Sequence, residues 1–288
     1  MTRSLLAYLV TIISTIGHAQ EYVYKNLTTE DGLPSNMVYE VSQDSKGFLW
    51  YSTDAGVSKY DGNQFINYTT KEGLGDNEIF HTYEDSKGRI WFLSYNGKIS
   101  YLFNNKIYNS SNTNYLENAD SQSYLNCIFE DSEGTIWIGT KSSGVVSIDK
   151  YNVVRKFKPK LQLFDFKESS VNYIFQNALN EIVVLTNAGK YRVNTKIFQL
   201  VVDHQNDHDY YNLIKRSAGN LIRGSLLNDS TLLLSKKDQL FVVDANNFNT
   251  RDVIQKSEIE GEIIFLHLSN DNFVWVGTRA GAFKYLHC

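Results

Sequence analysis

Asp44-Ser45-Lys46-Gly47-Phe48-Leu49-Trp50 is the stretch that decides the fold, because versions of it recur along the chain at a nearly constant spacing. The pattern is Asp-Ser-x-Gly-x-Φ-Trp, in which Φ is apolar. It returns at 85–91 and 131–137, a degenerate version occupies 269–275, and two further versions carry Val183 and Leu233 in place of the Trp. Positions 50 and 275 are separated by five periods, a mean of 45 residues, which is the period of a four-stranded propeller blade.

Each repeat contains four short β-prone runs separated by tight turns. In the first copy the runs are 38–42, 48–52, 57–60 and 64–68, and Asp61-Gly62 is a strong hairpin signal. One such meander cannot bury both of its faces, whereas meanders stacked around a ring do so. The sequence therefore predicts an all-β fold, a β-propeller of four-stranded antiparallel blades. The expected blade cores are near 36–68, 77–108, 123–157, 169–200, 212–254 and 262–285.

The number of blades follows from the copies of the repeat and from the N-terminal segment. Six copies predict six blades, or seven if 201–225 holds another. Residues 27–33 parallel 68–74, which follow a fourth strand, so 22–27 is expected to be a detached fourth strand. The last blade has only three strands. Pairing of 22–27 with 281–285 would close the ring and remove its exposed edges.

The two most recognisable residues of the motif are expected to be structural. The Trp lies on the second strand, where it would pack against the next blade. The Asp would accept hydrogen bonds from backbone N–H groups of its own turn. A catalytic role for these carboxylates is the alternative, but a catalytic residue need not recur in every blade.

The N-terminus has the pattern of an export signal. Met1-Thr2-Arg3-Ser4 precedes an apolar run at 5–16 and then Gly17-His18-Ala19, so we expect a signal peptide at 1–19 and cleavage after Ala19. An uncleaved anchor is the alternative, but the run is short for a span. The chain from 20 to 288 is then one periplasmic or secreted propeller domain with no membrane span.

Charge argues against nucleic-acid binding, and the cysteine content gives no sign of a disulfide-rich fold. The formal net charge is −4 and no basic cluster occurs, so nucleic-acid binding has no electrostatic support. Cys127 is expected to be a buried small apolar residue. A disulfide with Cys288 is the alternative, since an exported protein allows one.

These motifs resemble the two-component regulator propeller repeat. The residues that carry the resemblance are 32–36 (Gly-Leu-Pro-Ser-Asn), 84–91, 137–140 with Gly144, and 275–281. It covers about 22–285, is specific in the first three blades and is weaker from 165 to 260. It implies the periplasmic sensor region of the membrane histidine kinases, hybrid kinases included, of Bacteroidetes.

The resemblance also implies parts that are not found in this sequence. Family members have seven-bladed propellers, often two, followed by an immunoglobulin-like domain, a membrane helix and a kinase. Here Leu286-His287-Cys288 stands where a turn and a fourth strand are expected. We therefore expect a ligand-sensing propeller with no catalysis or cofactor of its own, truncated before the helix and kinase. The alternatives are a complete six-bladed protein, a protein-interaction scaffold, and a propeller lyase or hydrolase.

Candidate ligand-binding residues lie where the loops between blades enter the innermost strands, because equivalent positions from many blades converge at that end of the channel. They are Asn36, Asn77, Ser123 and Ser169. Neutral donors and acceptors suit the hydroxyls of an oligosaccharide or another small ligand, and capping of the strands is the alternative. The turns after the second strands add Tyr95, Lys141 and Arg279, with Asp54, at the same rim.

Two histidine-containing features are weaker candidates. Residues 203–209 hold His204 and His208 among three Asp, yet we expect a solvated loop and no metal site, because no helix fixes the geometry. His81 is the one acid–base candidate for a lyase, and it is more simply a core or channel residue.

Overall fold

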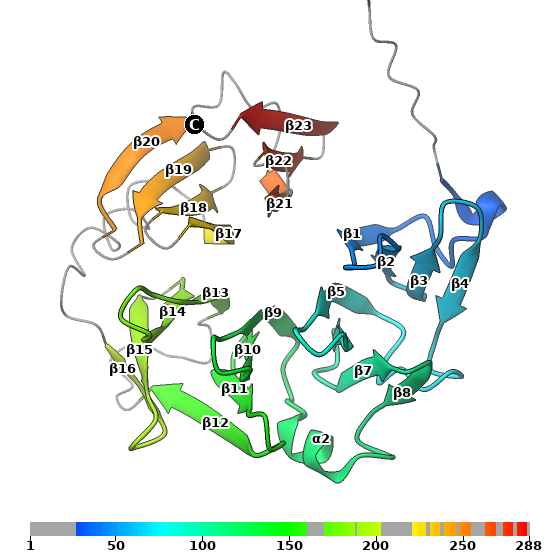
Figure 1. The fold of residues 1–288 in the computed structure, drawn as a ribbon, viewed down its shortest axis with the longest axis horizontal. Coiled ribbons are helices and arrows are strands. Elements are labelled where there is room, and N and C mark those ends of the chain that lie inside the picture. Colours follow the sequence, from blue (N-terminus) through cyan, green and yellow to red (C-terminus); the bar gives the residue numbers. More distant parts are fainter. Residues whose placement is uncertain are drawn as a thin grey trace, which may run out of the picture.

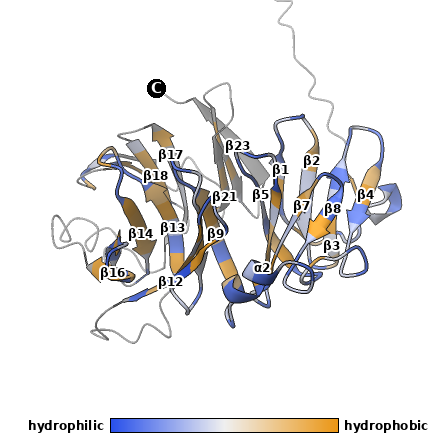
Figure 2. Cartoon of the chain, turned by 60° about the horizontal axis from the view of Figure 1, so that its bottom comes forward, coloured by the Kyte–Doolittle hydropathy of each residue, from blue (hydrophilic) through white to orange (hydrophobic). Residues whose placement is uncertain are grey.

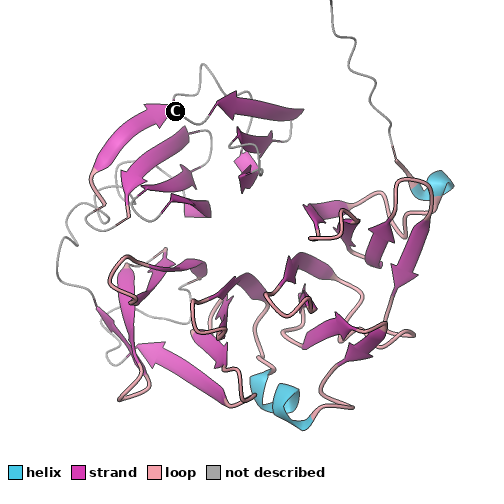
Figure 3. Ribbon diagram, viewed as in Figure 1, coloured by secondary structure: helices cyan, strands magenta, loops and turns pink. Residues whose placement is uncertain are grey.

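A computed structural model describes residues 27–159, 170–187, 189–202, 221–228, 231–236, 239–245, 248–254, 263–268, 273–278 and 281–286. Among them the only helical segments are the 3-10 turn η1 (Thr29–Asp31) and the six-residue helix α2 (Asn114–Ala119), both outside the sheets (Figure 3). The helix lies between the expected blade cores 77–108 and 123–157. The all-β class predicted from the sequence is confirmed.

The strands come in groups of four along the chain, except for the last group, which has three among the described residues. The first three groups are β1 (Val38–Gln43), β2 (Leu49–Thr53), β3 (Gly56–Tyr60), β4 (Phe65–Tyr68), β5 (Ile79–Glu84), β6 (Ile90–Ser94), β7 (Ile99–Phe103), β8 (Lys106–Tyr108), β9 (Leu125–Glu130), β10 (Ile136–Thr140), β11 (Val145–Ile148) and β12 (Val154–Pro159). The others are β13 (Val171–Gln176), β14 (Ile182–Thr186), β15 (Lys190–Asn194), β16 (Gln199–Val202), β17 (Leu221–Asn228), β18 (Thr231–Lys236), β19 (Gln239–Asp244), β20 (Thr250–Ile254), β21 (Ile263–Leu268), β22 (Phe273–Thr278) and β23 (Gly281–Leu286).

Each group is an antiparallel meander, as predicted, and the meanders are arranged around a common centre (Figure 1). The first strand of each meander lies innermost and the last lies outermost. Among the described residues the final meander, β21–β23, has three strands. β12 and β16 also pair in parallel through Lys158–Gln199 and Pro159–Leu200, which joins two meanders into one eight-stranded sheet.

Several expectations fall outside the described residues. These are the signal peptide at 1–19, all but residue 27 of the strand at 22–27, residues 203–220 of the segment 201–225 that could hold a further blade, the histidine-containing segment 203–209, Ser169, Arg279 and Cys288. Cys127 is described: it lies on β9, half-buried rather than fully buried, and its Sγ donates to Val171 O at 3.8 Å.

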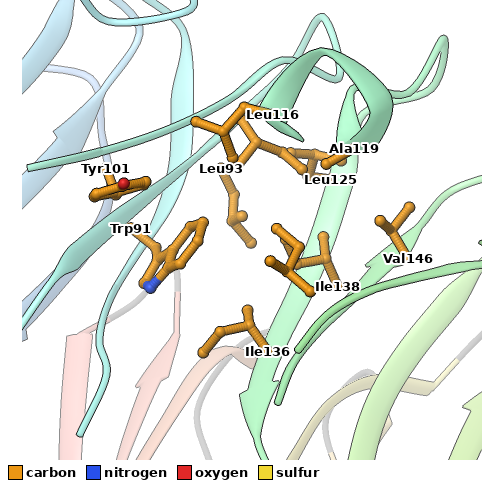
Figure 4. Packing of buried hydrophobic residues seen from close by; sticks show 11 residues of the cluster. Trp91, Leu93, Tyr101, Leu116, Ala119, Leu125, Ile136, Ile138 and Val146 are labelled. Atoms are coloured by element: carbon orange, nitrogen blue, oxygen red, sulfur yellow. The ribbon is translucent and has the colours of Figure 1, made fainter. Parts of the chain in front are cut away.

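Apolar side chains form the contacts between neighbouring meanders. Trp50 packs with Ile79 and Phe92 of the next meander, as predicted for the motif Trp. Figure 4 shows the following junction, where Trp91 and Leu93 face Ile136 and Ile138. Val183 and Leu233, which replace the Trp, are also buried in such clusters. In Figure 2 the strands are mostly apolar and the loops mostly polar, as this stacking requires.

The motif Asp organises its turn and also holds the Trp. Lys87 N and Arg89 N donate to Asp85 Oδ1 at 3.0 and 2.9 Å, which confirms the predicted backbone role. The indole Nε1 of Trp91 donates to Asp85 Oδ2 at 2.7 Å, a bond that the sequence analysis missed. Asp44 with Trp50 and Asp131 with Trp137 repeat the set. Gly88 completes the turn at φ +74°, where a side chain would be strained.

The motif Ser fastens each turn to the next meander. Ser86 N and Oγ both donate to the Glu130 carboxylate at 2.7 Å, and Ser45 binds Glu84 in the same way. In the third meander Ser132 N donates to Gln176 Oε1 at 2.9 Å. The motif therefore fixes one turn, one core Trp and one junction between blades.

The double role of the Asp predicts a graded loss of stability. Asp131→Ala removes the acceptors of two N–H groups and of a buried indole, so we expect it to lower the free energy of unfolding by about 2–4 kcal/mol. Asp131→Asn keeps the turn, as Asn177 does in the fourth meander, and should cost about 1 kcal/mol. Urea unfolding measures both, with the exposed neighbour Glu133→Ala as control. Equal losses in Ala and Asn variants would contradict the turn-closing role.

Candidate functional site

The candidate site lies at the end of the ring where the innermost strands begin, which we call the entry face. It consists of the loops that precede β1, β5, β9 and β13 and the turns that follow β2, β6, β10 and β14. A backbone bond recurs there: Tyr95 N donates to Glu78 O at 2.9 Å, Lys141 N to Tyr124 O at 3.1 Å, and Asn187 N to Ser170 O at 3.2 Å. This bond places Tyr95, Lys141 and Asn187 at equivalent positions of successive meanders.

Asn36 and Asn77 lie on the entry face and brace their own loops. Asn36 Oδ1 accepts from Thr29 N at 2.9 Å, and Asn77 Oδ1 accepts from Thr70 N at 2.8 Å. An acidic side chain braces each loop as well: Asp31 accepts from Thr28 N, and Glu72 accepts from Thr69 N. The amide oxygens are therefore engaged in loop structure.

Ser123 is buried and binds a neighbouring turn of its own meander. Ser142 N and Ser142 Oγ each lie 3.0 Å from Ser123 Oγ. Next to the undescribed Ser169, Ser170 N donates to Asn187 Oδ1 at 2.8 Å. The four predicted ring positions thus do not present equivalent polar groups; two brace loops and one binds within its blade.

Every innermost strand skips one residue in its pairing with the second strand. The register passes from Val38–Thr53 to Glu40–Ser52 and from Ile79–Ser94 to His81–Leu93, and the other inner strands shift at the equivalent place. The skipped residues are Tyr39, Phe80, Asn126, Asn172, Ile222 and Ile264. Such a bulge re-aims a side chain out of the ladder. The bulge therefore defines a second ring of positions near the start of the inner strands.

Aromatic side chains from three meanders meet on the entry face, and we call them the aromatic strip: Tyr39, Phe80, Tyr95 and Tyr124. The ring centroids of Tyr39 and Phe80 are 4.8 Å apart. Phe80 lies 5.8 Å from both Tyr95 and Tyr124, edge-on to each. Tyr95 and Tyr124 are 5.9 Å apart and nearly parallel, at 10°. Tyr95 is 52% exposed, and Lys141 Nζ lies 5.0 Å from the Tyr124 centroid.

The two ends of the strip differ in charge. At the β1 end, Tyr39 OH donates to Glu78 Oε1 at 3.0 Å. Burial, this bond and the nearby Glu78 and Asp54 charges together raise the pKa of Tyr39 to about 12. At the other end stands the exposed cation of Lys141. The strip thus runs from an acidic end to a basic end.

The amides that follow in the bulge ring differ from each other. Asn126 Nδ2 donates to Val171 O at 2.7 Å and to Ser170 Oγ at 3.3 Å, and so ties two meanders together. Asn172 is buried, and its Nδ2 has no hydrogen-bond partner among the described residues.

Within the described part of the chain, the ionisable groups considered for catalysis take part in structural contacts. The motif carboxylates are occupied by turns and indoles. His81 Nδ1 lies 3.1 Å from Glu40 Oε1, and Glu40 Oε2 accepts from Thr82 N at 2.9 Å, so this pair joins β1 to β5. No group of three His, Cys, Asp or Glu in the described ranges is arranged to hold a metal ion. Nor does any helix within those ranges have the length and apolar character of a membrane span.

Grooves also lie at the opposite end of the ring and follow from blade packing. One of about 750 Å³ separates the first two meanders and is lined by Trp50, Lys59 and the motif turns. Another, of about 450 Å³, occupies the equivalent place beside Trp137. Because the groove recurs with the repeat and is lined by residues that hold the blades together, volume alone does not make it the functional site.

Comparison with known families supports the propeller repeat. Residues 73–96 and 119–142 match the two component regulator propeller family. These segments contain the second and third copies of the motif, so the chain carries repeats of the family that it resembles. A search of curated proteins finds no match.

Solved structures with similar folds include members of two classes of protein. Two extracellular domains of hybrid two-component systems from B. thetaiotaomicron are each 19% identical to this chain. The first has a TM-score of 0.63, and the match covers 94% of this chain and 36% of that chain. The second has a TM-score of 0.53, and the match covers 90% of this chain and 41% of that chain. An inactive variant of virginiamycin B lyase from Staphylococcus aureus, solved with quinupristin, is 14% identical, with a TM-score of 0.65, covering 91% of this chain and 87% of that chain. At these identities the likeness shows a propeller-like fold. The chain spans about two fifths or less of the two sensor domains.

Sequence reasoning found Tyr95 and Lys141 but missed their partners. Tyr39 and Phe80 occupy the same position of successive repeats, three residues after Asn36 and Asn77. That alignment could have shown an aromatic pair. The bulge that turns them out of the ladder has no sequence signal here, because the strand alternation alone would place them on a blade face.

The loop-bracing role of Asn77 yields a test. Asn77→Ala leaves Thr70 N without its acceptor, so we expect a loss of about 1 kcal/mol in unfolding free energy, as for other side-chain caps. Asn77→Asp keeps an acceptor oxygen and should retain most of the stability. Denaturant unfolding of the two variants gives the comparison, with Asn63→Ala, in the exposed β3–β4 turn, as reference. Full stability of the Ala variant would show that the bond contributes nothing.

Proposed function

We propose that this chain is the extracellular ligand-sensing part of a two-component signalling protein. The observation that carries the proposal is the match of two segments to the regulator propeller family, together with the fold shared with extracellular domains of hybrid two-component systems. The extracytoplasmic location fits the proposed signal peptide at 1–19, followed by one propeller domain at 20–288. Sensing requires a ligand site on this domain.

The proposed ligand is a glycan bound at the entry face. The aromatic strip, which includes Tyr95, offers apolar ring faces. Asn36, Asn77, Ser123 and Lys141 are the predicted site residues of the same face that offer polar groups. Ser169 and Arg279 complete the proposed set and lie outside the described residues. Because Asn36 and Asn77 use Oδ1 for their loops, their Nδ2 groups are the donors left for ligand hydroxyls. Binding sites of this kind combine apolar faces with a few polar groups that set orientation.

A lyase is the second candidate, because the virginiamycin B lyase shares the fold over most of its own length. Such an enzyme needs an acid–base group that is positioned for proton transfer. The described histidine nearest to this role, His81, is bonded to Glu40 between two inner strands. The sensing role therefore accounts for more of the entry face than a lyase does.

The ligand proposal predicts binding without turnover. Isothermal titration of the mature chain, whose first residue should be Gln20 by mass, is expected to give saturable binding with at least one oligosaccharide of a broad panel, and no product should form. The pair Asn36→Asp and Asn77→Asp keeps the loop-bracing oxygens but removes both Nδ2 donors, and should weaken binding about tenfold. Unchanged affinity would remove both Asn from the site, and a panel without binding would leave the glycan proposal unsupported.

We further propose that six blades close into a ring in which 22–27 completes the last meander. Val38 marks the junction that closure has to fill: the residues at its position in the next three meanders and in the last, Ile79, Leu125, Val171 and Ile263, are all 0% exposed, while Val38 is 36% exposed. Each of those residues packs against the preceding meander. Val38 would be buried in the same way by β21–β23. Gln43 has the same arrangement as Gln176: in both, Nε2 donates to the carbonyl four residues later in the chain. Gln176 Oε1 accepts from Ser132 N of the preceding meander, so Gln43 Oε1 is placed to accept from the last meander in a closed ring.

Closure predicts that a charged residue at position 38 lowers the stability more than the exposure of Val38 suggests. Val38→Asp should destabilise the chain by about 2 kcal/mol more than Val201→Asp, because only the former would bury a carboxylate at a blade junction. The two valines are well matched, since both lie in strands and are 36% and 39% exposed. Thermal and urea unfolding measure the difference. Equal losses would contradict closure and favour an open arc of blades.

A further inference from the structure

The two ends of the aromatic strip carry opposite charges, and this difference indicates which kind of glycan it could bind. Its nearly parallel Tyr95–Tyr124 pair lies beside Lys141, whereas its Tyr39 end lies beside Glu78 and Asp54. A ligand that covers the strip therefore meets a cation at one end and carboxylates at the other.

Lys141 is held at this place by its backbone. Lys141 N donates to Tyr124 O at 3.1 Å, and the side chain passes over the Tyr124 ring. Within the described residues no carboxylate lies within ion-pair distance of Lys141 Nζ, although other cations, such as Arg89, Arg155 and Arg192, are paired. The contact with the ring orients the ammonium group without neutralising it. An anionic group on the ligand can neutralise it.

We propose that the strip binds a sugar that carries a carboxylate, a uronic acid residue of an oligosaccharide. The C–H face of its pyranose ring packs on the half-exposed Tyr95 ring beside Tyr124, and its carboxylate pairs with Lys141 Nζ. This inference rests on the proposed sensing function and narrows its ligand class. Glu78 and Asp54 repel a second carboxylate at the β1 end, so an acidic sugar is held in one orientation.

Charge and ring contacts contribute differently to this site. A carboxylate and an exposed ammonium attract weakly in water, and the attraction falls as salt rises. Packing on tyrosine rings depends on buried area and hardly on salt. The uronide preference should therefore fade at high ionic strength, while the binding due to stacking remains.

The experiment is calorimetric titration of the mature chain with three oligouronides, from pectate, alginate and a glucuronoxylan. Each is paired with its carboxyl-reduced neutral counterpart. At least one oligouronide should bind about tenfold more tightly than its neutral partner at low salt.

Lys141→Gln should abolish that preference, whereas Lys141→Arg keeps it. Tyr95→Ala should weaken both members of the pair, and Tyr95→Phe should retain them. Lys46→Gln, an exposed lysine of the first motif turn, should change nothing.

The outcomes separate this inference from the sensing function. Binding of neutral sugars with equal or higher affinity than uronides overturns the inference and leaves the glycan proposal standing. A uronide preference that survives Lys141→Gln overturns the assignment of the carboxylate to this residue. If no uronide binds, the inference is wrong, and if no sugar of the broad panel binds either, the glycan proposal falls with it. Circular dichroism of each variant shows that a loss of affinity is not a loss of fold.

Discussion

One carboxylate in each of the first three repeats carries much of this architecture. One oxygen of Asp85 closes a turn through two N–H groups, and the other oxygen holds the indole of Trp91. The Trp in turn fills the junction with the next meander, and the adjacent Ser86 is held by Glu130 of that meander. Local turn formation and long-range packing are therefore fixed by a single side chain and its neighbour. This explains why the motif keeps its order of residues: a turn acceptor, a junction donor, a glycine at positive φ and a core aromatic.

The fourth meander shows what remains when this interaction is reduced. Val183 replaces the Trp, and Asn177 replaces the Asp. Asn177 Oδ1 still accepts from Leu179 N and Glu181 N, so the turn persists. This meander has no indole for a carboxylate Oδ2 to bind. Asn177 has an Nδ2 group in place of that oxygen, and it donates to Glu181. In this meander both the Asp and the Trp are replaced, which fits an Asp whose second oxygen serves the indole.

The regular repeat allowed the fold to be predicted from the sequence, but it gave little signal for the candidate site. The spacing, the turn residues and the alternation within each strand were enough to predict the class, the meanders and the place of Trp50 at a junction. The entry face depends on features without a periodic signal. A bulge turns Tyr39 and Phe80 out of the ladder, and the loop-bracing bonds of Asn36 and Asn77 use atoms that a sequence reading leaves open for ligand. Spacing predicts which residues converge, but not which of their atoms are already engaged.

The entry face also departs from the symmetry of its scaffold, as the proposed binding of one specific ligand requires. A ring of identical residues would present the same contact in every direction and could not orient one molecule. Here the bulge position holds Tyr39 and Phe80 in the first two meanders and Asn126 and Asn172 in the next two. The position after the second strand changes from Asp54 to Tyr95 to Lys141. Because the turns, junctions and core are fixed by the motif at the other end of each blade, these positions can vary without disturbing the ring. The residues that hold the fold and those proposed to bind the ligand thus lie at opposite ends of the same short strands, so an asymmetric aromatic strip with charged ends can be built on a nearly symmetric frame.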